Sequence, residues 1–159
     1  MKKLFILIAG GIFLYSCGNQ NTPKDAGTSA PTTEEKKAEN GNPSYDPERG
    51  IGKYTSVDLG AKLDAAMAAK GKEVADVKCL SCHKTTDEKL VGPGWSGVTS
   101  RHKPEWIMNF ITNVNEMLDK DPKAQAQLEI CLVRMPNQNL SDDEARQLLE
   151  FMRKIDGVK

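Results

Sequence analysis

The pentapeptide Cys79-Leu-Ser-Cys-His83 restricts the chemistry and fold of this chain more than any other stretch. Two cysteines three positions apart, with a histidine directly after them, are typical of three kinds of site. These are a redox dithiol, a zinc knuckle and a covalently attached haem. Each kind needs a different surrounding sequence, so the rest of the chain has to decide between them.

The N-terminus has the features of an exported protein. Lys2 and Lys3 precede an apolar run of 11 residues, from Leu4 to Leu14. A helix of that length is too short for a bilayer core of about 30 Å. The run therefore predicts a secretory signal peptide over residues 1–16.

The signal peptide ends in Leu14-Tyr15-Ser16-Cys17, which resembles the bacterial lipobox, although Tyr15 is bulkier than usual there. The resemblance implies lipidation of Cys17 and cleavage after Ser16, and several acyl chains anchor a protein stably. The alternative is an ordinary signal peptide with an incidental cysteine. We expect a lipid anchor in the bacterial cell envelope, with the folded domain outside the cytoplasm, on the periplasmic side.

Residues 17–50 are rich in Asn, Thr, Pro, Gly, Ser, Lys and Glu and show no apolar periodicity. Such a segment cannot bury enough apolar surface to offset its ordering entropy, so it predicts a disordered linker. Residues 51–159 then form one folded domain. The chain has 22 basic and 22 acidic residues, and this balance does not favour nucleic-acid binding.

Apolar residues recur at helical spacing in the predicted domain, and no stretch reads as a strand. Proline in the first turn and a capping box mark helix starts. The pattern predicts an all-α domain with helices over Leu59–Val77, Lys103–Val114, Asp121–Leu132 and Ser141–Ile155. Two irregular stretches, 83–101 and 134–139, lie between them.

This context favours haem at Cys79–His83. A thioredoxin-like dithiol follows a strand, whereas a helix precedes this motif. Structural zinc needs four ligands, and the remaining Cys131 and His102 lack knuckle spacing, so a zinc-binding structural lipoprotein stays a lesser alternative. In haem attachment both sulfurs form thioethers and the adjacent histidine reaches the iron, and the ring would fill a modest core.

From Gly71 to the C-terminus the chain resembles the class I monohaem cytochromes c. The matching features are Gly71, the signature Cys79, Cys82 and His83, the Gly92-Pro93 element, and Met135-Pro136 before the last helix. The resemblance implies a cytochrome c-like fold of helices around one covalent haem c. It also implies that Gly71 lies where the first helix packs on the last. Ala75 departs from the family, which often has an aromatic residue there.

The resemblance further implies that His83 and Met135 are the two axial ligands of the iron. Pro136 keeps the chain around Met135 out of a helix. His102, 19 residues after His83, is the main rival, and we expect it to be a solvated surface residue. Met117 lies in a polar connection and could be either core filling or a ligand. The other candidates are expected to be mainly core filling: Met67, Met108, Met152 and Cys131.

Other side chains are expected to support the haem. The resemblance implies that the Pro93 carbonyl orients His83, and Trp95 is predicted to pack on the haem with its N–H toward a propionate. Trp106 is expected to be helix core. Cys131 is expected to be a small buried hydrophobe, with an intermolecular disulfide or a redox-sensitive thiol as alternatives.

A haem with both axial positions filled predicts one-electron transfer rather than catalysis. We expect an electron carrier that serves a respiratory oxidase or reductase through transient docking to redox proteins, with no small-molecule substrate. A haem sensor or enzyme with an open sixth position is the alternative. A cluster of basic residues suggests a partner with an acidic patch, unless it is an ordinary mixed surface: Lys78, Lys84, Lys89, Arg101 and Lys103.

Overall fold

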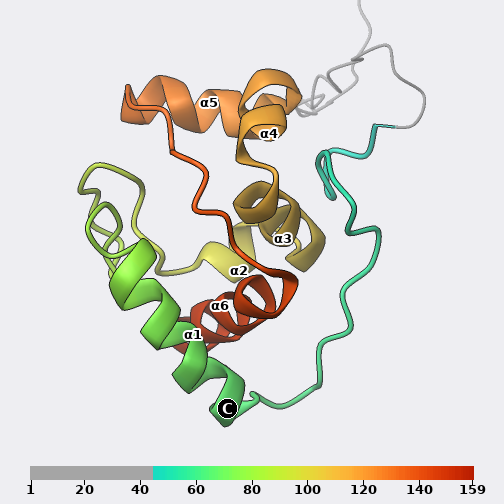
Figure 1. The fold of residues 1–159 in the computed structure, drawn as a ribbon, viewed down its shortest axis with the longest axis vertical. Coiled ribbons are helices and arrows are strands. Elements are labelled where there is room, and N and C mark those ends of the chain that lie inside the picture. The colour runs from blue at the N-terminus through green and yellow to red at the C-terminus, as the bar shows by residue number, and fades with distance from the viewer. Residues whose placement is uncertain (1–44) are drawn as a thin grey trace, which may run out of the picture. The chain divides into compact units, whose positions relative to one another are not determined.

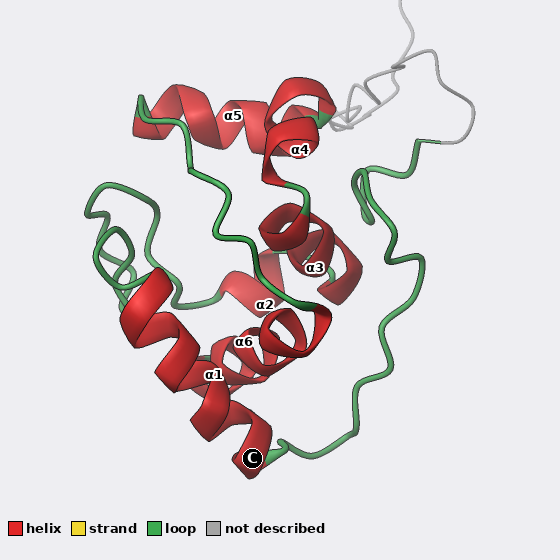
Figure 2. Ribbon diagram, in the orientation of Figure 1, coloured by secondary structure: helices red, strands yellow, loops and turns green. Residues whose placement is uncertain are grey.

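The computed structural model describes residues 45–159, and within this range the chain is helical without strands (Figures 1 and 2). The helices are α1 (Ala65–Lys78), α2 (Val98–Arg101), α3 (Pro104–Thr112), α4 (Val114–Lys120), α5 (Pro122–Cys131) and α6 (Asp142–Ile155). The predicted all-α class is confirmed. The predicted signal peptide, the lipidation site Cys17 and most of the predicted linker lie outside the described residues.

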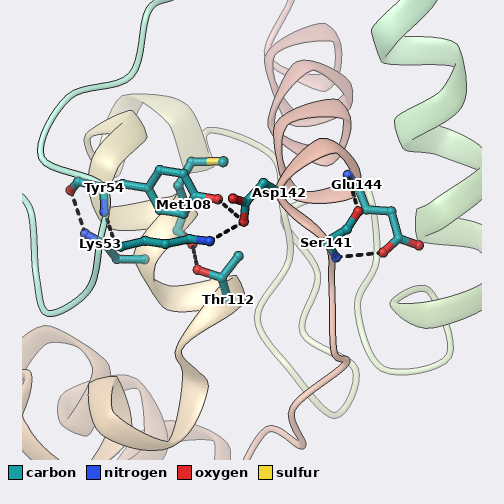
Figure 3. A network of polar contacts seen from close by, with 8 residues as sticks. Lys53, Tyr54, Met108, Thr112, Ser141, Asp142 and Glu144 are labelled. Carbon is teal, nitrogen blue, oxygen red and sulfur yellow. Dashed lines mark hydrogen bonds and ion pairs between the residues drawn. The ribbon is translucent and has the colours of Figure 1, made fainter.

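Three predicted helix starts are confirmed, one by its proline and two also by side-chain caps. Helices α3 and α5 begin at prolines, and the Asp121 side chain accepts a hydrogen bond from the Ala124 N–H at the start of α5. At the start of α6 the Ser141 hydroxyl and the Glu144 carboxylate each accept a backbone N–H from the other residue (Figure 3). Such caps satisfy N–H groups that a helix leaves free at its first turn.

The predicted start of the first helix, at Leu59, is wrong. Leu59 and Leu63 precede α1, which begins only after the N-cap Asp64, whose carboxylate accepts a hydrogen bond from Met67 N–H. Val77, near the end of α1, was also expected on the buried face of this helix, but its side chain is exposed. No helix among residues 45–159 has the length and apolar character needed to cross a membrane.

The polar connection predicted around Met117 is wrong as well. Residues 114–120 form α4, and Met117 is fully buried in it. Its sulfur lies 3.0 Å from the backbone nitrogen of Ile51, which donates a hydrogen bond to it. Its polar neighbours in the sequence suggested a connection, whereas this contact joins residues 66 positions apart.

Helices α1 and α6 cross at very short range, and this contact positions the haem motif at the end of α1. A Cβ atom at Gly71 would lie 2.0 Å from the backbone oxygen of Gln147 in α6. Ala68 and Ala75 are fully buried on the same helix. Small side chains therefore let the two backbones meet, and the predicted Gly71 contact with the last helix is present.

Residues 45–64, which we call the strap, run in an extended path along the domain before α1 (Figure 1). The strap begins with Tyr45, whose hydroxyl donates to the buried Asp121 at 2.7 Å. In its middle, Lys53 and Tyr54 bind Asp142 at the start of α6 (Figure 3). Near its end, Leu63 N–H donates to the backbone oxygen of Lys159.

Asn109 of α3 is the main internal anchor of the strap. Its side-chain amide is completely buried and donates to the backbone oxygens of Arg49 and Tyr54 at 3.0 and 2.9 Å. Its carbonyl oxygen accepts the Tyr54 N–H at 2.9 Å. A Cβ atom at Gly52 would lie 2.2 Å from that oxygen, so the strap passes directly against α3.

Candidate haem site

The candidate site is a cavity of about 680 Å³. Ligand and cofactor pockets commonly have volumes of this order, with mainly apolar walls and a few polar groups. Cys79, Cys82 and His83 line it, and Met135 reaches it from the stretch between α5 and α6. Further wall residues come from α3 and α6: Trp106, Ile107, Phe110, Ile111, Leu148 and Met152.

The haem motif forms a tight turn where α1 ends. Cys79 N–H still bonds to the Ala75 oxygen, and both Cys82 N–H and His83 N–H bond to the Cys79 oxygen at 3.0 Å. This turn brings two sulfurs and one imidazole to a single cavity. Both cysteines are free thiols rather than a disulfide.

The buried environment of Cys79 does not resemble a reactive dithiol. Burial raises the pKa of the Cys79 thiol to about 11. Redox-active Cys-x-x-Cys pairs instead have lowered thiol pKa values at exposed, electropositive positions. The structure thus gives no support to the dithiol alternative.

His83 is oriented by a backbone carbonyl, as predicted for Pro93. The Nδ1 atom donates to the Pro93 oxygen at 2.8 Å, and this leaves the lone pair on Nε2 for a metal. Burial lowers the pKa of His83, partly opposed by this hydrogen bond, which favours the neutral imidazole that ligation needs. Gly92 lies against the ring, since a Cβ there would be 2.3 Å from Cε1 of His83.

We expect Gly92→Ala to displace the His83 ring and break its hydrogen bond to Pro93. The added methyl group would overlap the ring, and the turn between Cys82 and Gly92 is itself fixed by a backbone hydrogen bond of 2.8 Å. The haem content per chain should fall, and the absorption spectrum of the haem-loaded fraction should change. An unchanged spectrum at full haem content would contradict the steric role of Gly92.

Trp95 lies beside His83, at the position predicted for haem packing. It is almost completely buried, with its ring centroid 5.4 Å from that of His83 and 6.4 Å from that of Phe151. The predicted direction of its N–H toward a propionate stays a prediction. Next to it, Arg101 donates to the backbone oxygens of Ser96 and Gly94, so this cation holds the loop that carries Trp95.

The prediction of a solvated His102 is wrong. Its ring stacks on Trp106 with a centroid distance of 4.0 Å, and Nε2 lies 3.0 Å from the side-chain nitrogen of Gln127. Burial, followed by the charges of Lys123 and Arg101, lowers the pKa of His102 to about 4. Its basic neighbours in the sequence suggested a surface, but the stacking partner follows one helical turn later.

His102 contributes a polar group to the cavity wall. Among the described residues, its buried Nδ1 atom has no hydrogen-bond partner, and the residue lines the cavity together with Gln127. A buried polar atom without a partner is unfavourable. A propionate of a bound haem is the kind of group that would satisfy it, so this wall suits a cofactor with an apolar ring and acidic edges.

The structure separates the methionines by their surroundings. Met135 is half-buried, lies outside any helix and lines the cavity, whereas Met108 and Met117 are buried in α3 and α4. Met152 also lines the cavity but belongs to α6. Cys131, at the end of α5, is half-buried and lines the cavity instead of being fully enclosed.

Nothing in the described range favours a zinc site. Over residues 45–159, no three His, Cys, Asp or Glu side chains are grouped so that they could hold a metal ion. Cys131 and His102 thus supply no second knuckle for Cys79 and Cys82.

Comparison with known proteins agrees with this geometry. The sequence model of the family described as Cytochrome c matches residues 68–156. The cytochrome c from Rhodothermus marinus shares 34% sequence identity with the chain. The match has a TM-score of 0.67 and covers 70% of this chain and 97% of that one. This chain belongs to the cytochrome c family.

Two engineered forms of the Rhodothermus marinus cytochrome c are also similar. One is 33% identical with a TM-score of 0.66, and another, described as bound to a carbene intermediate, is 33% identical with a TM-score of 0.63. Each match covers 70% of this chain and 98% of the other. No curated protein sequence matches the chain.

Membership of the cytochrome c family identifies the cofactor as covalently attached haem c and the general function as haem-based electron transfer. The predicted cytochrome c-like fold is confirmed. The cavity of this cytochrome fits such a group, because it combines free thiols, an imidazole with a free lone pair, apolar walls and an unsatisfied polar atom.

Proposed function

We propose that this protein is a membrane-anchored one-electron carrier whose haem iron has His83 and Met135 as axial ligands. The supporting observation is the single cavity shared by Cys79, Cys82, His83 and Met135. The two sulfurs would hold the ring as thioethers, and His83 Nε2 would bind the iron. Bound haem supplies an iron that takes up and releases one electron.

The surrounding residues suit a site that changes little between two oxidation states. The hydrogen bond to Pro93 and the contact with Gly92 restrain the ring of His83. Pro136 keeps Met135 out of a helix, and a thioether ligand raises the reduction potential relative to a second histidine. With both axial positions filled, no open position is left for a substrate, so we propose a carrier and not an enzyme.

We further propose that Cys17 carries the lipid anchor and that residues between it and the strap act as a tether. The support is the lipobox-like sequence before Cys17. Haem c is carried by an exported domain, so we place this one on the periplasmic side of the cell envelope. Its partners would be redox proteins of a respiratory chain, ending at an oxidase or a reductase.

The Met135 assignment is tested with Met135→Ala and with Met152→Leu as its control. Both methionines line the cavity, but only Met135 lies outside a helix. We expect Met135→Ala to change the absorption spectrum of the oxidised protein, to lower its reduction potential and to let the reduced protein bind carbon monoxide. Met152→Leu should keep the wild-type spectrum, because the two side chains have similar volumes.

An unchanged oxidised spectrum in Met135→Ala would contradict the ligand assignment. Tight carbon monoxide binding by the untreated, reduced wild-type protein would instead favour a sensor or enzyme with an open sixth position. A denaturing gel stained for peroxidase activity checks covalent haem in the same samples.

A further inference from the structure

The stretch between α5 and α6 carries Met135 and is fixed near both of its ends (Figure 1). At the α5 end, the Lys89 ammonium donates to the Ile130 backbone oxygen at 2.7 Å. At the α6 end, Ser141 caps the helix. Residues 132–140, which we call the Met135 segment, connect these two fixed points.

The backbone of the Met135 segment bends sharply near each end. Leu132 has a φ of 60° and Asn139 has a φ of 49°, and over residues 45–159 no other residue except glycine has a positive φ. Asparagine tolerates this left-handed conformation, whereas leucine is strained in it. Because the chain turns away from α5 and turns again before α6, neither helix sets the path of the residues between the two bends.

Arg134 holds the middle of the Met135 segment. Its Nη2 atom donates to the Asn115 backbone oxygen at 3.2 Å and to the Asp119 carboxylate at 2.6 Å. Within the described part of the chain, no other residue of 133–139 makes a hydrogen bond to a different part of the domain. The remaining hydrogen bonds of these residues join them to one another. Arg134 is thus their single polar connection to the rest of the domain.

Helix α4 is a firm attachment point for Arg134. Asn115 and Asp119 lie one turn apart on α4 and are exposed, whereas Met117 and Leu118 of the same helix are buried in the core. An arginine suits two acceptors placed in this way, because its guanidinium carries several N–H donors in a fixed planar arrangement. Arg134 therefore fixes the Met135 segment relative to a helix that is itself packed in the core.

The apolar contacts of Met135 do not by themselves fix the direction of its sulfur. The side chain is half-buried and packs against the core, and it lines both the haem cavity and an adjoining cavity of about 90 Å³. Apolar burial is non-directional, and a methionine side chain rotates about three bonds. A sulfur that has to meet a metal from one direction needs a fixed backbone. The nearest contact that fixes the backbone is that of the preceding residue, Arg134.

We propose that Arg134 is a positioning residue for the axial ligand. By binding Asn115 and Asp119 it keeps Met135 in place, and it thereby sets how rarely the sixth iron position opens to a small external ligand. The proposal rests on the proposed function, in which Met135 is that axial ligand. The side chains of Arg134 and Asp119 are 44% and 59% exposed, so salt screens their attraction. The closed state of the haem site therefore depends on a contact at the surface of the domain.

The test measures the apparent dissociation constant of imidazole for the oxidised, haem-loaded protein. Imidazole binds the iron only while the sixth position is open, so this constant falls as the open population rises. Arg134→Gln, whose new side chain is shorter and neutral, is compared with Lys120→Gln as a matched control. Lys120 forms an exposed ion pair with Glu116 within α4. Exposed pairs contribute little to global stability, so the urea midpoints of both variants should stay close to that of the wild type.

We expect the imidazole constant to fall about fivefold in Arg134→Gln, which corresponds to about 1 kcal/mol, and to stay unchanged in Lys120→Gln. Asp119→Asn should lower it about threefold, since the bond to the backbone oxygen remains. The double variant should bind imidazole no more tightly than Arg134→Gln alone, because both changes remove one contact. Raising the salt concentration from about 20 to about 500 mM should lower the constant about twofold in the wild type but not in Arg134→Gln.

The positioning role would be overturned by an unchanged imidazole constant in Arg134→Gln or by an equal fall in Lys120→Gln. It would also be overturned if the effect of the double variant equalled the product of the two single effects, because the side chains would then act independently. Met135→Ala separates this role from the proposed function. If Met135→Ala bound imidazole as weakly as the wild type, the ligand assignment itself would fail, whatever the result for Arg134→Gln.

Discussion

The Gly71→Ala variant is expected to lose about 3 kcal/mol of unfolding free energy, within the upper range for overpacked contacts. The new methyl group would lie 2.0 Å from the backbone oxygen of Gln147, so α1 and α6 would have to move apart. A backbone atom cannot rotate away as a flexible side chain can. Urea unfolding of the haem-loaded protein, followed by circular dichroism, measures the loss.

Whether Gly71→Ala lowers or raises the free energy of unfolding decides between a close contact and an open helix position. At an unobstructed helix position, glycine to alanine stabilises by about 1 kcal/mol. Gly60→Ala is the matched control, because its nearest atom would be 3.4 Å from the new Cβ, and little change is expected. A stabilised Gly71→Ala protein would show that the two helices do not touch at this point.

Asn109→Ala is expected to release the middle of the strap and to cost about 3 kcal/mol. The substitution removes three hydrogen bonds and leaves the Tyr54 N–H and two backbone oxygens without their partner. Each buried polar group left unsatisfied costs about 1–3 kcal/mol, although water entering the site would reduce the sum. Residues 49–54 should become sensitive to limited proteolysis before the domain unfolds globally.

Asn115→Ala is the control for the strap, because Asn115 is exposed on the neighbouring helix α4. Its stability and cleavage pattern should match those of the wild type. If Asn109→Ala were equally resistant to protease, the strap would be held mainly by its other contacts, at Asp121 and Asp142.

Local signals in the sequence were sufficient for several parts of the fold. The prolines that begin α3 and α5 and the capping box of α6 act within one helical turn, so the sequence predicted these helix starts correctly. The strap has no such signal. Its hydrogen bonds to Asn109 join residues 55 and 60 positions apart, and neither partner shows a pattern by itself.

The candidate site could be predicted where haem attachment fixes the spacing of its residues along the chain. The turn at Cys79–His83 and the Pro93 carbonyl on His83 lie as the family resemblance implied. His102 was wrongly predicted to be a solvated surface residue. The prediction rested on its charged neighbours in the sequence, which do not reveal that its ring stacks on Trp106. Met117 was misjudged for a related reason, since its sulfur contacts Ile51 of the strap, 66 positions away.

The position of the strap has a mechanical consequence. A force that pulls on the chain from before Tyr45 meets the bond from Tyr45 to Asp121 first and then the three bonds at Asn109. The later strap contacts, at Asp142 and at the backbone oxygen of Lys159, must also break before tension reaches α1 and the turn at Cys79. The contacts of the strap therefore bear a pull on the chain before α1 and the turn at Cys79 do.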